Sequence, residues 1–159
     1  MGSDGEFELV WREPQRLAGK IWQGSYRDAA EGRVKPVIGE MAQLLHRLDP
    51  GRKRGGVIGI SWNDIEGGFR YLAALPPALA DAATGDGIEH VELPQTRLAT
   101  AWHGAADGDV FAHYERMFAW IEAQGLRRVN VPFHHREEYS AGIDLDAPPE
   151  LQLMAPVAG

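Results

Sequence analysis

The sequence contains no cysteine among its 159 residues. Disulfide bridges, thiol catalysis and cysteine-bound metals are therefore excluded. Basic residues are also scarce, because 16 Lys and Arg face 23 Asp and Glu, which gives a net charge of −7. Binding to nucleic acid depends on Lys and Arg that neutralise phosphates. We therefore expect no direct contact with nucleic acid, whereas an acidic protein is suited to cationic small molecules.

Long apolar runs are missing as well. No stretch reaches the roughly 18 consecutive apolar residues that a bilayer span requires. Residues 1–6 have neither the basic start nor the apolar run of a secretory signal. We expect no membrane contact, a cytoplasmic location and a disordered tip at residues 1–6. The hydrophobic content of 44% in a chain of this length predicts one globular domain with a sizeable core.

The chain carries an internal repeat. The pair Pro-Gln at residues 14–15 returns at 94–95, and the motif Trp-x-Gly at 22–24 returns at 102–104, in both cases about half the chain length later. The order of predicted elements repeats too, which argues against a chance match. Two copies of one unit usually pack around a pseudo-twofold axis. The seam between them is then a natural place for a ligand pocket.

The pattern of apolar residues predicts the elements of each half. Helical spacing begins close to Val34 or Lys35 and stops at 49–51, and a second helix follows an N-cap at 107–109 and ends at Gly125. Residues 24–28 are expected to be a loop, and 78–86 a linker or short helical turn. Alternation predicts strands at residues 7–11, 17–22, 57–62, 69–74, 88–93, 97–103, 129–139 and 151–157.

These elements predict an α+β fold. The order strand, strand, helix, strand, strand occurs twice, over halves of approximately 7–80 and 87–157. Connections of hairpin length favour a largely antiparallel sheet, here of about eight strands with two main helices. We expect a single domain over residues 7–157 with pseudo-twofold symmetry.

Several short motifs, in this order, resemble the GyrI-like effector-binding domain, which is also found at the end of AraC-type and MerR-type multidrug regulators. The resemblance covers most of residues 7–157 and rests on residues 56–64 with 69–71, 93–104, 115–120 with Gly125, 137–139 and 154–157. It implies a small-molecule-binding domain like those of transcription regulators. No DNA-binding helix-turn-helix precedes the motifs, so the chain is similar to the stand-alone members.

Glu137 is the leading candidate for the binding site. The resemblance implies that it is the acidic contact for cationic, aromatic ligands, although Arg136 replaces the aromatic residue that usually precedes this motif. Alternation on a strand places Glu137, Tyr139 and His135 on one face and Glu138 on the other, where we expect solvent. Burial would raise the pKa of Glu137. The alternative is a solvated Glu137, or one that pairs with Arg136 or Arg70.

Aromatic residues near the predicted seam could form the walls of the pocket, through cation–π attraction to a ligand. Filling of the core is the alternative for each of them, and it is the interpretation we favour for Tyr114 and Phe118. Phe111, on the second helix, could reach the cleft. The candidates on strands are Trp62, Tyr71, Trp102 and Tyr139, together with Trp22, the repeat counterpart of Trp102.

Metal binding is not predicted. His134 and His135 are adjacent and would point to opposite faces of a strand, while His103 and His113 lie apart without a zinc-binding spacing. No catalytic triad and no phosphate-binding glycine loop is present. We expect no cofactor.

Three functions remain open. The first is the binding of hydrophobic, aromatic, cationic small molecules, for drug sensing or sequestration. The second is an enzyme, because some stand-alone members hydrolyse reactive cyclopropane-containing natural products; Glu137 would then be the general base, and Trp102 or Trp62 would orient the electrophile. The third is interaction with a protein partner such as DNA gyrase, as the family name suggests.

Overall fold

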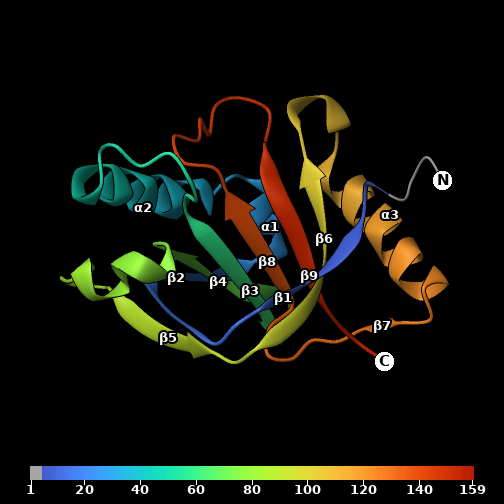
Figure 1. Cartoon of the computed structure of the whole chain (residues 1–159). Helices are drawn as coiled ribbons and strands as arrows, with labels where there is room; N and C mark the ends of the chain where they lie inside the picture. Colours follow the sequence, from blue (N-terminus) through green and yellow to red (C-terminus); the bar gives the residue numbers. More distant parts are fainter. Residues whose placement is uncertain (1–4) are drawn as a thin grey trace.

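The computed structural model describes residues 5–159, so residues 1–4 of the tip that we expected to be disordered lie outside the described residues. The predicted α+β class is confirmed (Figure 1). The elements are β1 (Glu8–Arg12), β2 (Gln15–Ser25), α1 (Tyr26–Ala30), α2 (Lys35–Leu48), β3 (Ile58–Ile65), β4 (Gly68–Ala74), the 3-10 turn η1 (Pro77–Ala82), β5 (Glu89–Leu93), β6 (Thr96–His103), the 3-10 turn η2 (Ala105–Asp107), α3 (Val110–Ala123), β7 (Arg127–Arg128), β8 (His135–Tyr139) and β9 (Leu151–Ala158).

The strands form one antiparallel sheet whose order is symmetric. From edge to edge it runs β1-β6-β9-β8-β3-β4-β2-β5, with β7 added to β9. Each strand of the first half has a counterpart in the second: β1 corresponds to β5, β2 to β6, β3 to β8 and β4 to β9. If every strand in the order is replaced by its counterpart, the result is the same order read from the other edge. The predicted pseudo-twofold arrangement is therefore confirmed. Its centre is the pair β3 and β8, one strand from each half.

The first strand of each half is exchanged with the other half. β1 and β2 are separated only by Glu13 and Pro14, yet β1 pairs with β6 and β2 pairs with β5. The expectation of hairpins from short connections is wrong here. Proline fixes its own backbone and keeps the preceding residue extended, so the chain continues forward at Pro14 and Pro94. The repeated Pro-Gln pair therefore marks the two places where the chain passes from a strand paired with the other half into the next strand.

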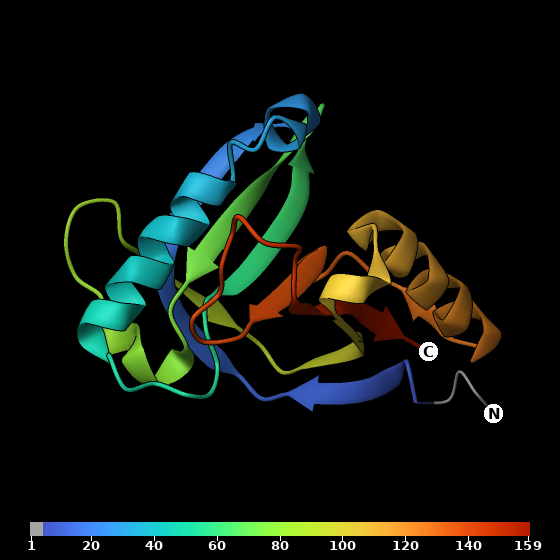
Figure 2. The same cartoon turned by 90° about the horizontal axis from the view of Figure 1, so that it is seen from above.

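Three cores hold the sheet together. One lies under α2 and contains Met41 and Tyr71, and another lies under α3 and contains Met117 and Leu153. The third fills the inside of the curled sheet and contains Ile60 and Met154, alternating in sequence with the residues of the other face. Figure 2 shows α2 and α3 on the same side of the sheet, with the two central strands between them.

Two local predictions were wrong. Residues 24–28 were expected to form a loop, but the short helix α1 begins at Tyr26, because Ser25 and Asp28 make a reciprocal capping box that satisfies the first backbone N–H groups. Residues 129–134, expected in a strand, form none, and β8 begins only at His135. The segment keeps single backbone hydrogen bonds to the sheet, from Val129 to β9 and from His134 to β3. Pro132 has no N–H to donate to a neighbouring strand. Among residues 5–159, no helix has the length and apolar character needed to cross a membrane.

Candidate functional site

Glu137 lies on β8, at the seam between the halves, directly opposite Gly59 on β3. Its Oε2 accepts two hydrogen bonds of 3.0 Å each, from the hydroxyls of Tyr71 on β4 and Tyr139 on β8. Two of the predicted ligand-binding residues therefore hold a third. Because each half contributes to this cluster, Glu137, Tyr71 and Tyr139 form a site that neither half could build alone.

Gly59 is what allows Tyr71 to reach the carboxylate. Tyr71 pairs with Ser61 across β3 and β4, and its ring extends diagonally over Gly59. A Cβ placed on Gly59 would lie 2.0 Å from the Tyr71 hydroxyl oxygen. A close approach of this kind is a common reason for glycine inside a strand. Gly59 was not predicted from the sequence, where its only signal is a glycine between two isoleucines of a strand.

The carboxylate of Glu137 is partly buried and has no cationic partner. Burial raises the pKa of Glu137, and the hydrogen bonds from Tyr139 and Tyr71 partly offset this rise. Burial and the nearby Glu137 charge raise the pKa of both tyrosines well above the usual value, so their hydroxyls stay protonated and donate. Arg70 pairs instead with Asp64. Within residues 5–159, no Lys, Arg or His lies at ion-pair distance from Glu137.

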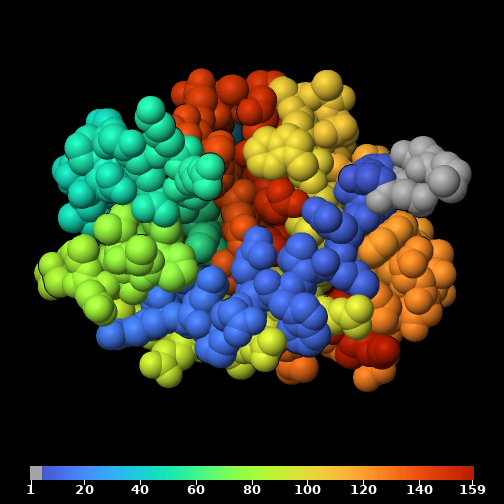
Figure 3. Space-filling model, in the orientation of Figure 1, coloured from blue at the N-terminus to red at the C-terminus, as the bar shows by residue number. Residues whose placement is uncertain are grey.

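A cavity of about 460 Å³ adjoins this cluster at Tyr139. Its walls come from α2, η2 and the segment 140–150, and include Lys35, Ile38 and Ala105. Figures 2 and 3 show the segment 140–150, in orange-red, between α2 and the yellow η2 turn. Ile143 and Leu145 in this segment pack against the α2 core. The segment therefore forms a cover over one side of the seam.

A larger hollow of about 750 Å³ lies on the far side of that cover, between α2 and residues 140–145. Its lining includes neither Glu137 nor Tyr139, and it exposes charged side chains such as Arg47, Arg52 and Asp49. Ligand pockets are mostly apolar with a few directed polar groups. The smaller cavity fits that description better, because it adjoins the tyrosine that binds Glu137.

The other predicted aromatic residues do not all join this cluster. Trp22 pairs with Tyr71 across β2 and β4, on the same face, and packs against Phe69 at 5.2 Å between ring centroids. Trp62 and Trp102 occupy strand positions of the opposite face, because they alternate with residues of the helix-covered face. Trp62 donates from Nε1 to the carbonyl of Pro132 at 3.2 Å.

Phe111 and Trp102 are both exposed. Phe111 is 77% exposed on α3 and does not line the cavity. Trp102 is 49% exposed. Tyr114, predicted to be core, is buried and stacks on His135 at 4.4 Å between ring centroids. Burial lowers the pKa of His135 to about 3, with the neighbouring His134 and Arg128 acting in the same direction. His135 is therefore neutral beside the site.

Glu138 was expected in solvent, and this was wrong. It is largely buried and accepts a bidentate contact from Arg12, at 3.0 and 2.9 Å, and a third hydrogen bond of 2.7 Å from Arg136. Arg136 itself is buried and also donates to Gln15 at 2.9 Å. Arg136 and Arg12 thus neutralise the charge of Glu138, and neither arginine pairs with Glu137. Because adjacent residues of a strand point to opposite faces, the carboxylates of Glu137 and Glu138 lie on opposite sides of the sheet.

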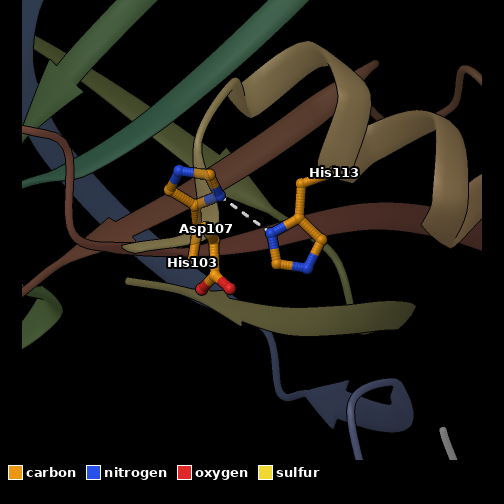
Figure 4. A group of neighbouring side chains, drawn as sticks. All are labelled: His103, Asp107 and His113. Atoms are coloured by element: carbon orange, nitrogen blue, oxygen red, sulfur yellow. Dashed lines mark hydrogen bonds between the residues drawn. The ribbon is translucent and has the colours of Figure 1, made fainter. Parts of the chain in front are cut away.

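One further cluster was missed in the sequence. His103 at the end of β6, Asp107 in η2 and His113 in the first turn of α3 place their ligand atoms within 4.8 Å of one another (Figure 4). Among residues 5–159, this is the group of His, Asp and Glu side chains whose arrangement could hold a metal ion. The separation in sequence concealed the cluster, because the chain turns back between a strand and a helix.

Comparison with known proteins gives a family match. The model of the GyrI-like small molecule binding domain matches residues 5–150. A search of curated protein sequences gives no significant match.

Solved structures share the fold at low sequence identity. SAV2435 bound to tetraphenylphosphonium is 16% identical with a TM-score of 0.66, over 97% of this chain and 94% of that chain. The C-terminal domain of EcmrR is 15% identical with a TM-score of 0.61, over 96% and 97%. A hydrolase from Listeria innocua is 13% identical with a TM-score of 0.58, over 96% and 92%. At these identities the likeness shows the fold alone.

Proposed function

The chain belongs to the GyrI-like small-molecule-binding family, and from this premise we propose that it binds hydrophobic, aromatic cations at the seam between its halves. Glu137 supplies the counter-charge, and Tyr71, Tyr139 and Trp22 supply aromatic surface next to it. The cavity beside Tyr139 receives the ligand. Such binding serves drug sensing or sequestration.

The observation that carries the proposal is the unpaired state of Glu137. A buried charge is costly unless it is paired, and the remaining buried acidic group nearby, Glu138, has two arginines. Glu137 has only two tyrosine hydroxyls, which orient the carboxylate without cancelling its charge. A lipophilic cation provides the missing charge, and the faces of the aromatic rings add cation–π attraction.

The structural neighbours support the same chemistry. SAV2435 holds tetraphenylphosphonium, an aromatic cation, on a related fold. In the present chain, the cavity that adjoins Tyr139 at the seam supports the same location for such a ligand.

The test is a titration with tetraphenylphosphonium, followed by tryptophan fluorescence, of the wild type and of Glu137→Gln. Glutamine keeps the shape of the side chain and removes its charge. We expect saturable binding by the wild type and an affinity at least roughly tenfold lower for the variant, as for the loss of a charged partner worth 1.5–3 kcal/mol.

Two controls make the result specific. Glu66→Gln changes an exposed carboxylate in the β3–β4 turn, and should leave the affinity unchanged. Triphenylphosphine oxide is a neutral aromatic probe that should not distinguish the wild type from Glu137→Gln. If Glu137→Gln binds tetraphenylphosphonium as well as the wild type does, Glu137 is not the counter-charge and the proposal fails.

A hydrolase is the second candidate, because the raised pKa of Glu137 suits a general acid or base. The proposed tryptophan partners do not support it, since Trp62 and Trp102 occupy positions of the other face of the sheet. Time-dependent loss of a cyclopropane-containing substrate that stops in Glu137→Gln would favour the enzyme over the binding protein.

A further inference from the structure

Two buried histidines face each other beside η2. The Nδ1 atoms of His103 and His113 are 2.8 Å apart, and both residues are at most 1% exposed. The Nε2 atom of His103 lies 3.1 Å from the carbonyl oxygen of Gly108. The Nε2 atom of His113 makes no hydrogen bond and has the Glu6 carboxylate 3.2 Å away, at ion-pair distance.

These contacts fix the tautomer of His103, but each neutral tautomer of His113 makes one unfavourable contact. A carbonyl oxygen only accepts, so His103 carries its proton on Nε2 and presents a lone pair at Nδ1. If neutral His113 carries its proton on Nδ1, it bonds to His103, but its Nε2 lone pair then faces the negative carboxylate of Glu6. If neutral His113 carries its proton on Nε2 instead, that proton faces Glu6, but the Nδ1 lone pairs of His103 and His113 then face each other.

A metal cation removes this conflict. It accepts both Nδ1 lone pairs, while Nε2–H of His103 donates to the carbonyl of Gly108 and Nε2–H of His113 lies beside the Glu6 carboxylate. Histidines that bind metals almost always donate their other ring N–H to a carboxylate or a backbone carbonyl, which fixes the tautomer. His103 already has this environment at Gly108, and at His113 the Glu6 carboxylate lies 3.2 Å from Nε2 without a formed hydrogen bond.

Asp107 completes a donor set for one ion. Its Oδ2 accepts a 2.7 Å hydrogen bond from the backbone N–H of Gly104, which anchors the carboxylate within 4.8 Å of the two nitrogens. Two imidazoles and one carboxylate form a set that zinc accepts, with a fourth position open. We propose that His103, Asp107 and His113 bind a divalent transition metal of the zinc class (Figure 4).

The adjustment required of the two imidazoles is small. Two nitrogens bound to one tetrahedral zinc at 2.0–2.1 Å lie roughly 3.3 Å apart. The Nδ1 atoms would separate by about half an ångström, between His103 at the last position of β6 and His113 in the first turn of α3. The site is separate from Glu137, so its test does not depend on the ligand proposal.

The experiment is a calorimetric titration of the full chain, freed of any affinity tag, with zinc chloride at pH 7.5. We expect one saturable site. Asp107→Asn is the informative variant, because Asp107 is exposed and asparagine keeps an acceptor for Gly104. Its zinc affinity should fall at least roughly tenfold, the lower bound seen even for groups that only orient ligands.

The matched control is Asp109→Asn, two residues away. Asp109 caps α3 by accepting from the N–H of Phe111, and asparagine is an equally good cap. Cobalt chloride provides a second measurement, since a bound cobalt ion shows visible absorption bands that should disappear with His113→Gln. Circular dichroism establishes that this buried variant is folded; should it not fold, the comparison of Asp107→Asn with Asp109→Asn decides.

Two results would overturn the proposal. The first is the absence of saturable zinc binding, which would leave a proton, shared between the two Nδ1 atoms, as the cation of this cluster. The second is equal zinc affinity of Asp107→Asn and Asp109→Asn, which would place the metal elsewhere.

Discussion

The hydroxyl of Tyr71 on β4 donates a 3.0 Å hydrogen bond to Oε2 of Glu137 on β8, and it crosses the intervening strand β3 to do so. The crossing is possible at Gly59, the residue opposite Glu137. The tyrosine belongs to the first half of the repeat and the glutamate to the second. This contact links the two halves at the seam and, together with the hydrogen bond from Tyr139, orients the carboxylate.

Gly59→Ala should destabilise the protein by about 1–3 kcal/mol, the usual cost of overpacking, because the new methyl group would clash with the Tyr71 hydroxyl. Chemical denaturation measures the change. Gly51→Ala is the matched control, since a Cβ at Gly51 meets nothing within 4 Å. Equal stability of the two variants would mean that Tyr71 does not occupy the space above Gly59.

Tyr71→Phe and Tyr139→Phe should each raise the pKa of Glu137 further, because each removes a hydrogen bond that favours the charged carboxylate. Carbon-13 NMR of the labelled side-chain carboxyl measures the titration. Tyr26→Phe serves as control, because Tyr26 is exposed on α1. A Glu137 titration that is identical in all three variants would contradict the hydrogen bonds.

Affinity for tetraphenylphosphonium should fall as the pH is lowered through the raised pKa of Glu137. The cation binds the ionised carboxylate, so below that pKa each binding event must release a proton, and the affinity falls by up to about tenfold per pH unit. Because the pKa is raised, the fall starts at a higher pH than it would for an exposed glutamate. Glu137→Gln should show a flat profile, and a parallel fall in that variant would assign the effect to another group.

Glu138→Gln should cost about 3 kcal/mol of stability, since it leaves Arg136 buried without a counter-charge. Burial alone would raise the pKa of Glu138, but the hydrogen bonds and charges of Arg12 and Arg136 outweigh it and lower the pKa. The carboxylate therefore stabilises the fold above its unfolded pKa, and this contribution is lost as the pH falls through the folded pKa. Denaturation at several pH values should show the difference from the wild type shrinking in acid, whereas Glu66→Gln should differ little at any pH.

The sequence by itself predicted the two long helices and the order of most strands, although it missed α1 and placed a strand over residues 129–134. The apolar spacing and the stop at 49–51 were sufficient for α2, and the N-cap signal at 107–109 with Gly125 was sufficient for α3, whose N-cap is Asp109. Alternation placed Glu137 and Tyr139 on one face of β8, and the repeat predicted the symmetry. The helices and the faces of a strand depend on neighbours within a few residues, where backbone geometry leaves little choice, whereas the symmetry was predicted from the repeat of the whole unit.

Tertiary structure alone decided what meets Glu137. Alternation says which residues of one strand share a face, but the register between strands assigns those faces to one side of the sheet or the other. That register brought Tyr71 to Glu137 and put Trp62 and Trp102 on the opposite face. It also gave Glu138 its arginine from the exchanged strand β1. The His103–His113 pair arose in the same way, because the turn between β6 and α3, rather than the spacing in the sequence, sets the distance between the two rings.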